Sequence, residues 1–271
     1  MGSPAHANVP RRGVRDGFTT VTPYLMASDI EPVIAFAKRT FGASETMRVG
    51  GGGGGIHCEL RIGDSMLMCG GGAGTFNPAI PTRLVGLQTY VDDVDTTFAR
   101  ALAAGGTSLA APTDQPYGER SGFIQDPGGN HWYISKRSAP DDAAGPLRTL
   151  TPHLYVEHRA GRDAAAFIGF LKAALGAQQT FRHDSTDGLV GYAVLRLGDA
   201  NLAVGEGRDP GRTAPAAFYL YVEDCDALCA RAVAAGAKGT HPPADQRHGD
   251  RMGTVEDPWG NEWFIATHGG P

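Results

Sequence analysis

The sequence has no apolar run long enough to cross a membrane and no excess of basic charge. A spanning helix needs roughly 18 or more consecutive apolar residues, and no stretch of the 271 residues approaches that length. The first residues, MGSPAHANVPRRGVRDG, also lack the apolar core of a secretion signal. Lys and Arg number 24 against 29 Asp and Glu, which disfavours nucleic acid and anionic membranes as partners. We therefore expect a cytoplasmic protein that binds a small molecule or another protein.

What the sequence does have is a long internal repeat. The segment GERSGFIQDPGGNHWYIS, residues 118–135, returns as GDRMGTVEDPWGNEWFIAT at residues 249–267. Four further pairs follow the same order: TPYLMASD and TPHLYVEH, FAKRTFGASETMR and FLKAALGAQQTFR, LRIGDSMLM and LRLGDANLA, YVDDVDTTFARALAAGG and YVEDCDALCARAVAAGA. The chain is therefore a tandem duplication, and each copy serves as a control on the other.

Cysteine is scarce, with 4 residues in the chain. Cys225 and Cys229 are spaced four apart on a predicted helix, which could hold a metal. Their counterparts in the first copy, however, are Val94 and Phe98. We therefore interpret these cysteines as small buried hydrophobic residues.

Each copy predicts the order strand, helix and three strands, twice over. In the first copy these elements are VTPYLMA, EPVIAFAKRTFG, ETMRV, IHCELRI and SMLMC, then LVGLQTYV, DVDTTFARALAAGG, SLAAP, GFIQD and HWYIS. We predict an α+β protein of four βαβββ units, each half forming a domain. The expected boundaries are a flexible tail at 1–17, a first domain at 18–137, a linker at 138–148 and a second domain at 149–268.

Paired βαβββ units that end in DPxGNxW resemble the vicinal oxygen chelate superfamily, which includes glyoxalases, bleomycin-resistance proteins and extradiol dioxygenases. The segments TPYLMASD, HCELRIGDSMLM and YVDDVD resemble its PhnB-like glyoxalase branch. The resemblance covers roughly residues 18–267 and implies two tandem glyoxalase-like domains with open, concave mixed sheets. It fixes the fold more closely than the activity, because one fold hosts many chemistries.

In metal-using members, the resemblance implies a His or Gln on the opening strands and a Glu on the final strand. The opening-strand positions correspond to Thr22, Gly86, Thr151 and Ala217, and the Glu positions to Tyr133 and Phe264. None of these side chains is a good ligand for a divalent metal. We expect no cofactor at the usual positions, and a zinc, iron or manganese ion at a non-standard site stays open.

Strand alternation predicts which side chains face the concave side. In IHCELRI, His57, Glu59 and Arg61 lie opposite the apolar face. The same alternation assigns to the first cavity Thr22, Tyr24, Gln88, Tyr90, His131 and Tyr133. Their counterparts in the second cavity are Thr151, His153, Tyr155, Tyr192, Val194, Tyr219, Tyr221 and Phe264. Trp132 and Trp263 then point into the core.

These side chains support two functional hypotheses. The aromatic second cavity favours metal-independent binding of a flat, partly apolar molecule, such as an aromatic antibiotic or metabolite that the protein sequesters. Alternatively, His57, Glu59 and His131 act as metal ligands or acid–base groups of a lyase, isomerase or dioxygenase. A further alternative is that the rings fill a collapsed core and bind no ligand. We expect the protein to be a monomer or a homodimer. Arg120 and Arg251 occur in both copies and are interpreted as structural ion-pair residues.

Overall fold

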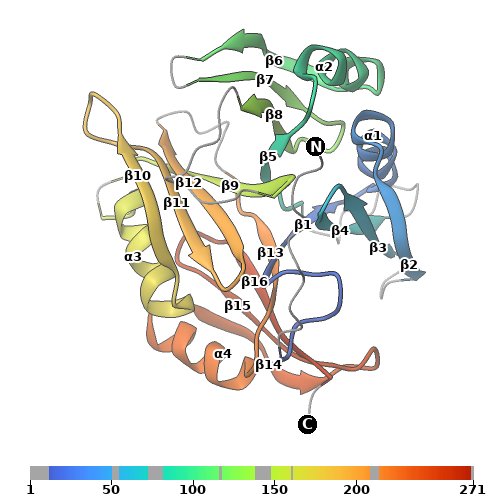
Figure 1. The fold of residues 1–271 in the computed structure, drawn as a ribbon. Coiled ribbons are helices and arrows are strands. Elements are labelled where there is room, and N and C mark those ends of the chain that lie inside the picture. The colour runs from blue at the N-terminus through green and yellow to red at the C-terminus, as the bar shows by residue number, and fades with distance from the viewer. Residues whose placement is uncertain are drawn as a thin grey trace.

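The computed structural model of the chain describes residues 12–50, 55–72, 82–115, 118–137, 148–159, 161–207 and 214–269. Within them the chain forms sixteen strands and four helices, arranged as two eight-stranded mixed sheets with the helices packed outside (Figure 1). This arrangement confirms the predicted α+β class. The predicted linker lies outside the described residues except for Arg148.

All four units repeat the predicted βαβββ order. The first contains β1 (Val21–Ala27), α1 (Glu31–Phe41), β2 (Ser44–Gly50), β3 (Gly55–Ile62) and β4 (Ser65–Gly72). The second contains β5 (Gly86–Tyr90), α2 (Val94–Ala103), β6 (Thr107–Asp114), β7 (Glu119–Gln125) and β8 (His131–Arg137). The third contains β9 (Leu150–Glu157), α3 (Ala164–Leu175), β10 (Gln178–Asp184), β11 (Val190–Leu197) and β12 (Ala200–Gly207). The fourth contains β13 (Ala217–Tyr221), α4 (Cys225–Ala234), β14 (Lys238–Asp245), β15 (Asp250–Glu256) and β16 (Glu262–His268).

Each sheet combines one unit from each half of the chain. The first sheet has the order β14-β15-β16-β13-β1-β4-β3-β2, and the second has β10-β11-β12-β9-β5-β8-β7-β6. The units meet through antiparallel central pairs, β1 with β13 and β5 with β9. The first unit thus shares a sheet with the fourth, and the second with the third. Both concave faces are shared between the halves, which differs from the grouping that we expected.

Short polar residues fix the ends of the helices. Asp93, Asp163 and Asp224 each accept a hydrogen bond from a backbone N–H in the first turn of α2, α3 and α4, which satisfies an otherwise unpaired donor. The first helix begins differently, because Ile30 stands at its N-cap and no side chain caps it. It ends at Gly42, whose φ of 67° is the left-handed conformation that glycine adopts without strain.

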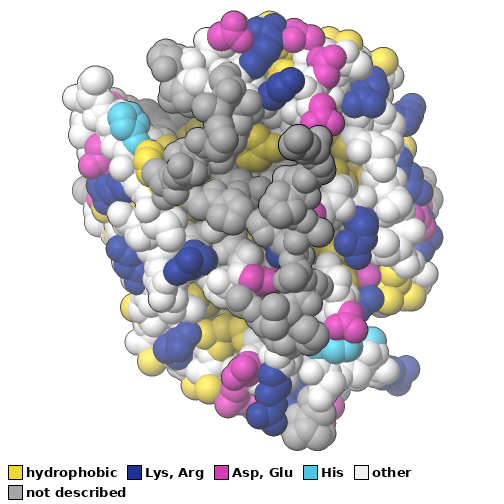
Figure 2. All heavy atoms as spheres, in the orientation of Figure 1, with side chains coloured by type: hydrophobic (Ala, Val, Ile, Leu, Met, Phe, Trp, Pro, Cys, Tyr) yellow, Lys and Arg dark blue, Asp and Glu magenta, His cyan; other side chains and the backbone are white. Residues whose placement is uncertain are grey.

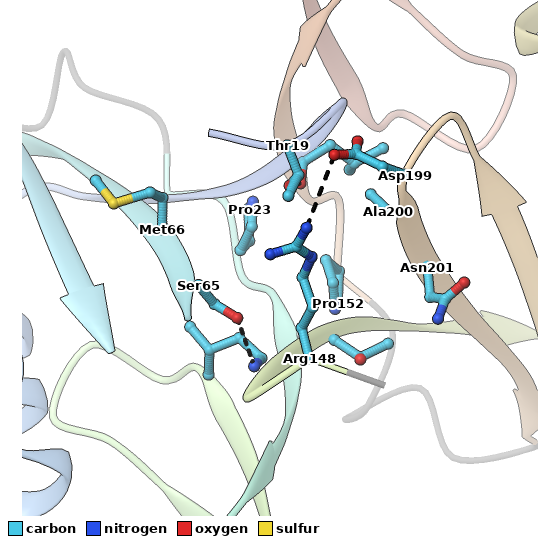
Figure 3. A pocket seen from close by; sticks show the side chains of 12 residues that line it. Thr19, Pro23, Ser65, Met66, Arg148, Pro152, Asp199, Ala200 and Asn201 are labelled. Atoms are coloured by element: carbon cyan, nitrogen blue, oxygen red, sulfur yellow. Dashed lines mark hydrogen bonds and ion pairs between the residues drawn. The ribbon is translucent and has the colours of Figure 1, made fainter. Parts of the chain in front are cut away.

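Two hairpin aspartates tie the halves together at their strand entrances. Asp199, between β11 and β12, accepts hydrogen bonds from the backbone N and the Oγ1 of Thr20, both at 2.9 Å. Its counterpart Asp64 accepts one from the backbone N of Thr149 at 2.8 Å. Arg148 lies 3.8 Å from Asp199 (Figure 3). The cavity beside these residues measures about 30 Å³, which is room for one water but not for a ligand.

The repeated DPxGNxW segment builds a buried turn in each half. Asp257 is 3% exposed and accepts hydrogen bonds from the backbone N of Trp259 and the indole Nε1 of Trp263, at 2.8 and 2.9 Å. Asp126 makes the equivalent bond to Trp132 at 3.0 Å. Both indoles are fully buried in the core, as predicted for packing residues.

The repeated arginines, on β7 and β15, form exposed ion pairs with the neighbouring helix and with the preceding strand. Arg120 binds Asp95 at 2.6 Å and Asp114 at 3.1 Å. Arg251 binds Asp226 and Asp245 with the same distances. This duplicated geometry confirms their structural role.

Acidic and basic side chains are interspersed over the face shown in Figure 2. None of the helices in the described part of the chain is both long and apolar enough to span a bilayer.

Replacing Asp257 by Asn is expected to destabilise the protein. The amide would present N–H groups to donors that now bind a carboxylate, so we expect a loss of about 2–4 kcal/mol in the free energy of unfolding. Urea denaturation monitored by circular dichroism measures it. Asp245→Asn, which changes an exposed partner of Arg251, is the matched control and should change little. Equal stability of the two variants would contradict a structural role for the buried turn.

Candidate functional site

The two concave faces are the candidate sites, and they carry different side chains at equivalent positions. The first concave face, as we call it, is the surface of the first sheet that carries Tyr24, His57, Glu59, Tyr219, Tyr221 and Phe264. The second concave face, on the second sheet, carries Gln88, Tyr90, His131, Tyr133, His153, Tyr155 and Tyr192. Side chains therefore alternate along these strands as predicted. The strands that share a face, however, come from both halves of the chain, which differs from the expected cavities.

A chain of polar groups crosses the first concave face from β1 to β3. The hydroxyl of Tyr24 lies 3.0 Å from Nδ1 of His57, and Nε2 of His57 lies 3.5 Å from Oε1 of Glu59. Burial raises the pKa of Tyr24 well above its usual range, so the phenol keeps its proton and can donate a hydrogen bond to Nδ1 of His57. With Nδ1 accepting from Tyr24, the Nε2–H of His57 faces the Glu59 carboxylate.

Glu59 also binds an arginine from the segment that precedes β1. Nη1 and Nη2 of Arg15 lie 2.5 and 3.0 Å from the two carboxylate oxygens. Glu59 is only 2% exposed. Burial acts to raise the pKa of Glu59, but the hydrogen bonds from His57 and Arg15 outweigh it and hold that pKa below the usual value. The carboxylate is thus ionised and paired at neutral pH.

Phe18 follows Arg15 onto the same face. Its ring is 3% exposed, and its centroid lies 5.5 Å from that of Tyr221 in an edge-on arrangement. Around it lies a small apolar cluster that is separate from the main core: Met66, Met68, Tyr219, Tyr221 and Ala266. The segment expected as part of a flexible tail therefore covers this face from residue 12 onward.

A second buried carboxylate lies at the far end of the first concave face. Asp250 accepts a hydrogen bond from the hydroxyl of Tyr219 at 2.8 Å and lies 2.7 Å from Nδ1 of His268. The corresponding acid in the other half, Glu119, accepts one from Tyr90 at 2.9 Å. Sequence reasoning missed both acids, although the repeat of an acidic residue before each arginine was a usable signal. Arg15 lies outside the repeat, so no comparable signal existed.

The second concave face carries an aromatic cluster, formed by Phe123, His131, Tyr133, His153, Tyr155 and Tyr192. Tyr133 stacks on Phe123 with centroids 4.3 Å apart and an interplanar angle of 13°. His153 stacks on Tyr155 at 4.7 Å, while Tyr192 meets the His153 ring edge-on at 5.4 Å. The rings of Tyr133, Tyr155 and Tyr192 are partly exposed. Beside the cluster, Nε2 of Gln88 donates to Oγ of Ser135 at 2.7 Å.

The structure separates the three residues of the enzyme hypothesis. His57 and Glu59 lie together on β3, but His131 lies on β8 in the other sheet, 5.1 Å from the ring of Phe123. Arg61 lies on the first sheet with its guanidinium against Gly17. A single site built from His57, Glu59 and His131 is therefore not formed, because the second unit pairs with the third.

The positions that hold a metal in the family divide between the two sheets. Thr22, Ala217 and Phe264 lie on the first sheet, and Gly86, Thr151 and Tyr133 on the second. Neither set includes a carboxylate or an imidazole, so their donor chemistry does not fit a divalent metal. Within the described residues, no group of three or more His, Cys, Asp or Glu side chains is placed to hold an ion.

Comparisons with known proteins agree with this architecture. A family model described as "Glyoxalase/Bleomycin resistance protein/Dioxygenase superfamily" matches residues 18–134 and 155–265. An uncharacterised protein of Mycobacterium bovis, Mb0911c, is 38% identical over 129 residues, which cover 43% of this chain and 82% of that protein. "Putative glyoxylase CFP32" of Mycobacterium tuberculosis is 29% identical over 179 residues, covering 64% of this chain and 66% of that protein.

Solved structures are similar over nearly the whole chain. Glyoxalase I from Zea mays has a TM-score of 0.67 at 16% identity, covering 91% of this chain and 92% of that one. A Bacillus subtilis protein described as a "putative dioxygenase" has a TM-score of 0.60 at 14% identity, covering 92% and 86%. At these identities the likeness concerns the fold alone. The PhnB-like branch stays a prediction.

Glu59 is expected to make stability depend on pH. Its folded pKa lies below its usual value of 4.5, so its contribution is complete above pH 4.5 and is lost as the pH falls through the folded value. At pH 7, Glu59→Gln should lower the free energy of unfolding by about 1.5–3 kcal/mol, the range for a hydrogen bond to a charged group. The difference from the wild type should shrink by pH 3. Denaturant titrations at both values measure it.

Glu45→Gln is the control, because Glu45 pairs with Arg48 and Lys38 at the surface and such pairs contribute little. A deficit for Glu59→Gln that stays constant with pH would contradict an ionised, paired Glu59.

Proposed function

Because the chain belongs to the Glyoxalase/Bleomycin resistance protein/Dioxygenase superfamily, we propose that it binds a flat, partly apolar small molecule on the second concave face, without a metal. The observation that carries the proposal is the aromatic cluster, whose rings adjoin one another across four strands and are partly exposed. Sequestration of an aromatic antibiotic or metabolite is the function that such a surface serves.

The arrangement of the rings favours a planar ligand. Phe123 and Tyr133 stack with an interplanar angle of 13°, and His153 and Tyr155 stack with one of 29°, so the cluster contains two stacked pairs, which His131 and Tyr192 meet edge-on. A flat ring that extends such a stack gains about 0.5–1.5 kcal/mol per aromatic pair beyond the effect of the area that it buries. A saturated ring of the same size gains the burial but not the stacking.

Polar groups at the edge of the cluster are suited to orient the ligand. Tyr90 and Glu119 form a hydrogen-bonded pair on one side, and Gln88 is held by Ser135 close to Tyr133 on the adjacent strand. A carboxylate accepts hydrogen bonds and an amide both donates and accepts. The face therefore suits an aromatic molecule that carries hydroxyl or amino substituents.

The donor chemistry at the usual metal positions supports binding over metal-dependent turnover. Thr, Gly and Tyr stand at those positions on this sheet, and they do not supply the ligand field of a Lewis-acid centre. The ligand would thus be held by stacking, burial and hydrogen bonds.

Calorimetric titration with 2-naphthol and with its saturated analogue 2-decalol tests the proposal. We expect saturable binding of the aromatic compound and at least about tenfold weaker binding of the saturated one, because only the first can stack. A wider panel of hydroxylated polycyclic compounds then identifies the preferred ring system. A panel with no saturable binder would overturn the proposal.

Tyr133→Leu should weaken binding of 2-naphthol about tenfold, because the central ring of the aromatic cluster is lost. The matched control is Phe264→Leu, since Phe264 occupies the position of Tyr133 on the other sheet. The control should leave the affinity unchanged. Equal losses in the two variants would place the ligand elsewhere.

A further inference from the structure

We propose that the first concave face is a separate site for an organic cation joined to an apolar ring, and that residues 12–18 of the chain occupy it as an intramolecular stand-in for that ligand. This inference does not depend on the proposed function, because it concerns the other sheet. The amino-terminal segment, as we call residues 12–18, supplies both parts of the ligand chemistry. Arg15 supplies the charge and Phe18 supplies the ring.

The charge requirement comes from Glu59. Its carboxylate is almost fully buried and is bound through both oxygens by the Arg15 guanidinium, with distances of 2.5 and 3.0 Å. A planar guanidinium matches a carboxylate in this two-point geometry. Removing one partner of such a pair leaves an uncompensated buried charge, which is strongly unfavourable. Any molecule that replaces the segment must therefore bring its own positive charge.

The ring requirement comes from the cluster around Phe18. The Phe18 side chain packs among Met66, Met68 and Tyr221, and the Arg15 guanidinium carbon lies 4.7 Å from its ring centroid. Tyr24 and Phe264 extend the apolar lining, with centroids 5.5 Å apart. Methionine side chains adapt readily to rings of different shape. The site thus accepts an apolar ring within about one ring width of the cation.

Few backbone bonds hold the segment on the face. The N–H of His268 donates to the carbonyl of Gly13, and the N–H of Phe18 donates to the carbonyl of Arg15 within the segment, at 2.9 and 3.0 Å. The segment is not a strand of the sheet. In Figure 1 it is the dark blue stretch beside β13 that leads into β1. It can therefore leave the face without breaking the ladder of either sheet.

An open groove borders the segment on its outer side. This groove, of about 690 Å³, is lined by Arg12 and Val14 of the segment, by Tyr221 and by Leu228 of α4. Solvent thus reaches the edge of the occupied face.

His57 would set the position of the cation. It lies between the hydroxyl of Tyr24 and the carboxylate of Glu59. This contact holds the Glu59 side chain in the orientation in which its carboxylate binds Arg15. The counterparts of His57 and Glu59 on the second sheet are Tyr192 and Val194, which carry no charge. The second concave face therefore lacks a carboxylate at the position that Glu59 occupies on the first.

Calorimetric titration of the full chain with 2-phenylethylguanidine tests the proposal. In the Arg15→Gln/Phe18→Ala double variant the internal competitor is weakened, so we expect binding at least about tenfold tighter than in the wild type. N-(2-phenylethyl)urea has nearly the same shape without the charge and should bind at least about tenfold more weakly than the guanidine. Adding Glu59→Gln to the double variant should abolish the preference. Tyr133→Leu, on the other sheet, should not alter the guanidine affinity of the wild-type chain.

Displacement is also measurable in the wild-type chain, which covers the case in which the double variant fails to fold. Chymotrypsin cleaves after exposed phenylalanine, so the guanidine should accelerate cleavage after Phe18, while the urea should not. Equal affinity for the two compounds, an effect of the guanidine that survives Glu59→Gln, or equal cleavage rates would each overturn the proposal.

Discussion

The antiparallel pairing of β1 with β13 and of β5 with β9 determines which units share a sheet, and therefore which side chains share each concave face. Through these central pairs each sheet joins a unit of one half to a unit of the other. The two aspartates between hairpin strands, Asp64 and Asp199, strengthen the junction by binding Thr149 and Thr20 at the strand entrances. Neither half of the chain forms a complete concave face by itself. Each face therefore brings together side chains from both copies of the repeat.

Duplication provides two equivalent faces, and substitution on the strands has made them different. The first face has a buried carboxylate with a histidine beside it, and an arginine of the same chain binds that carboxylate. The second has Tyr192 and Val194 at the positions of that histidine and carboxylate, beside stacked aromatic rings. Because the scaffold residues Asp126, Asp257, Trp132 and Trp263 are kept in both halves, this divergence leaves the core untouched. The two faces therefore differ in chemical character on a shared scaffold.

Much of the local structure could be predicted from the sequence. Alternation along IHCELRI assigned His57 and Glu59 to the concave side correctly, and the repeated Arg120 and Arg251 were identified as ion-pair residues. The physical reasons are that side-chain direction alternates from residue to residue along a strand, and that a residue kept in both copies of a duplication is a candidate for a role in the scaffold. The N-cap of α1 was harder to predict from the sequence. Ile30 occupies that position, and Asp29, one residue earlier, accepts a hydrogen bond from the N–H of Glu31.

The composition of each candidate site could not be predicted, because it depends on which units pair. Both halves contain compatible edges at β1, β5, β9 and β13, and no local pattern distinguishes pairing within a half from pairing between halves. His131 therefore was grouped with His57, although they lie on different sheets. Arg15 was missed for a related reason, since a residue outside the repeat has no counterpart with which to compare it.

The β1–β13 pair also has a consequence for the order in which the molecule matures. Val21 pairs with Leu220, about 200 positions along the chain, whereas Leu87 pairs with Pro152, a much shorter separation that closes sooner. During synthesis from the amino terminus, the second sheet has all its strands before the fourth unit emerges. In the first unit, by contrast, the edge of β1 stays unpaired until β13 has been synthesised. The second concave face, with the aromatic cluster, can therefore form first during synthesis. The first concave face, covered by Arg15 and Phe18, is completed last.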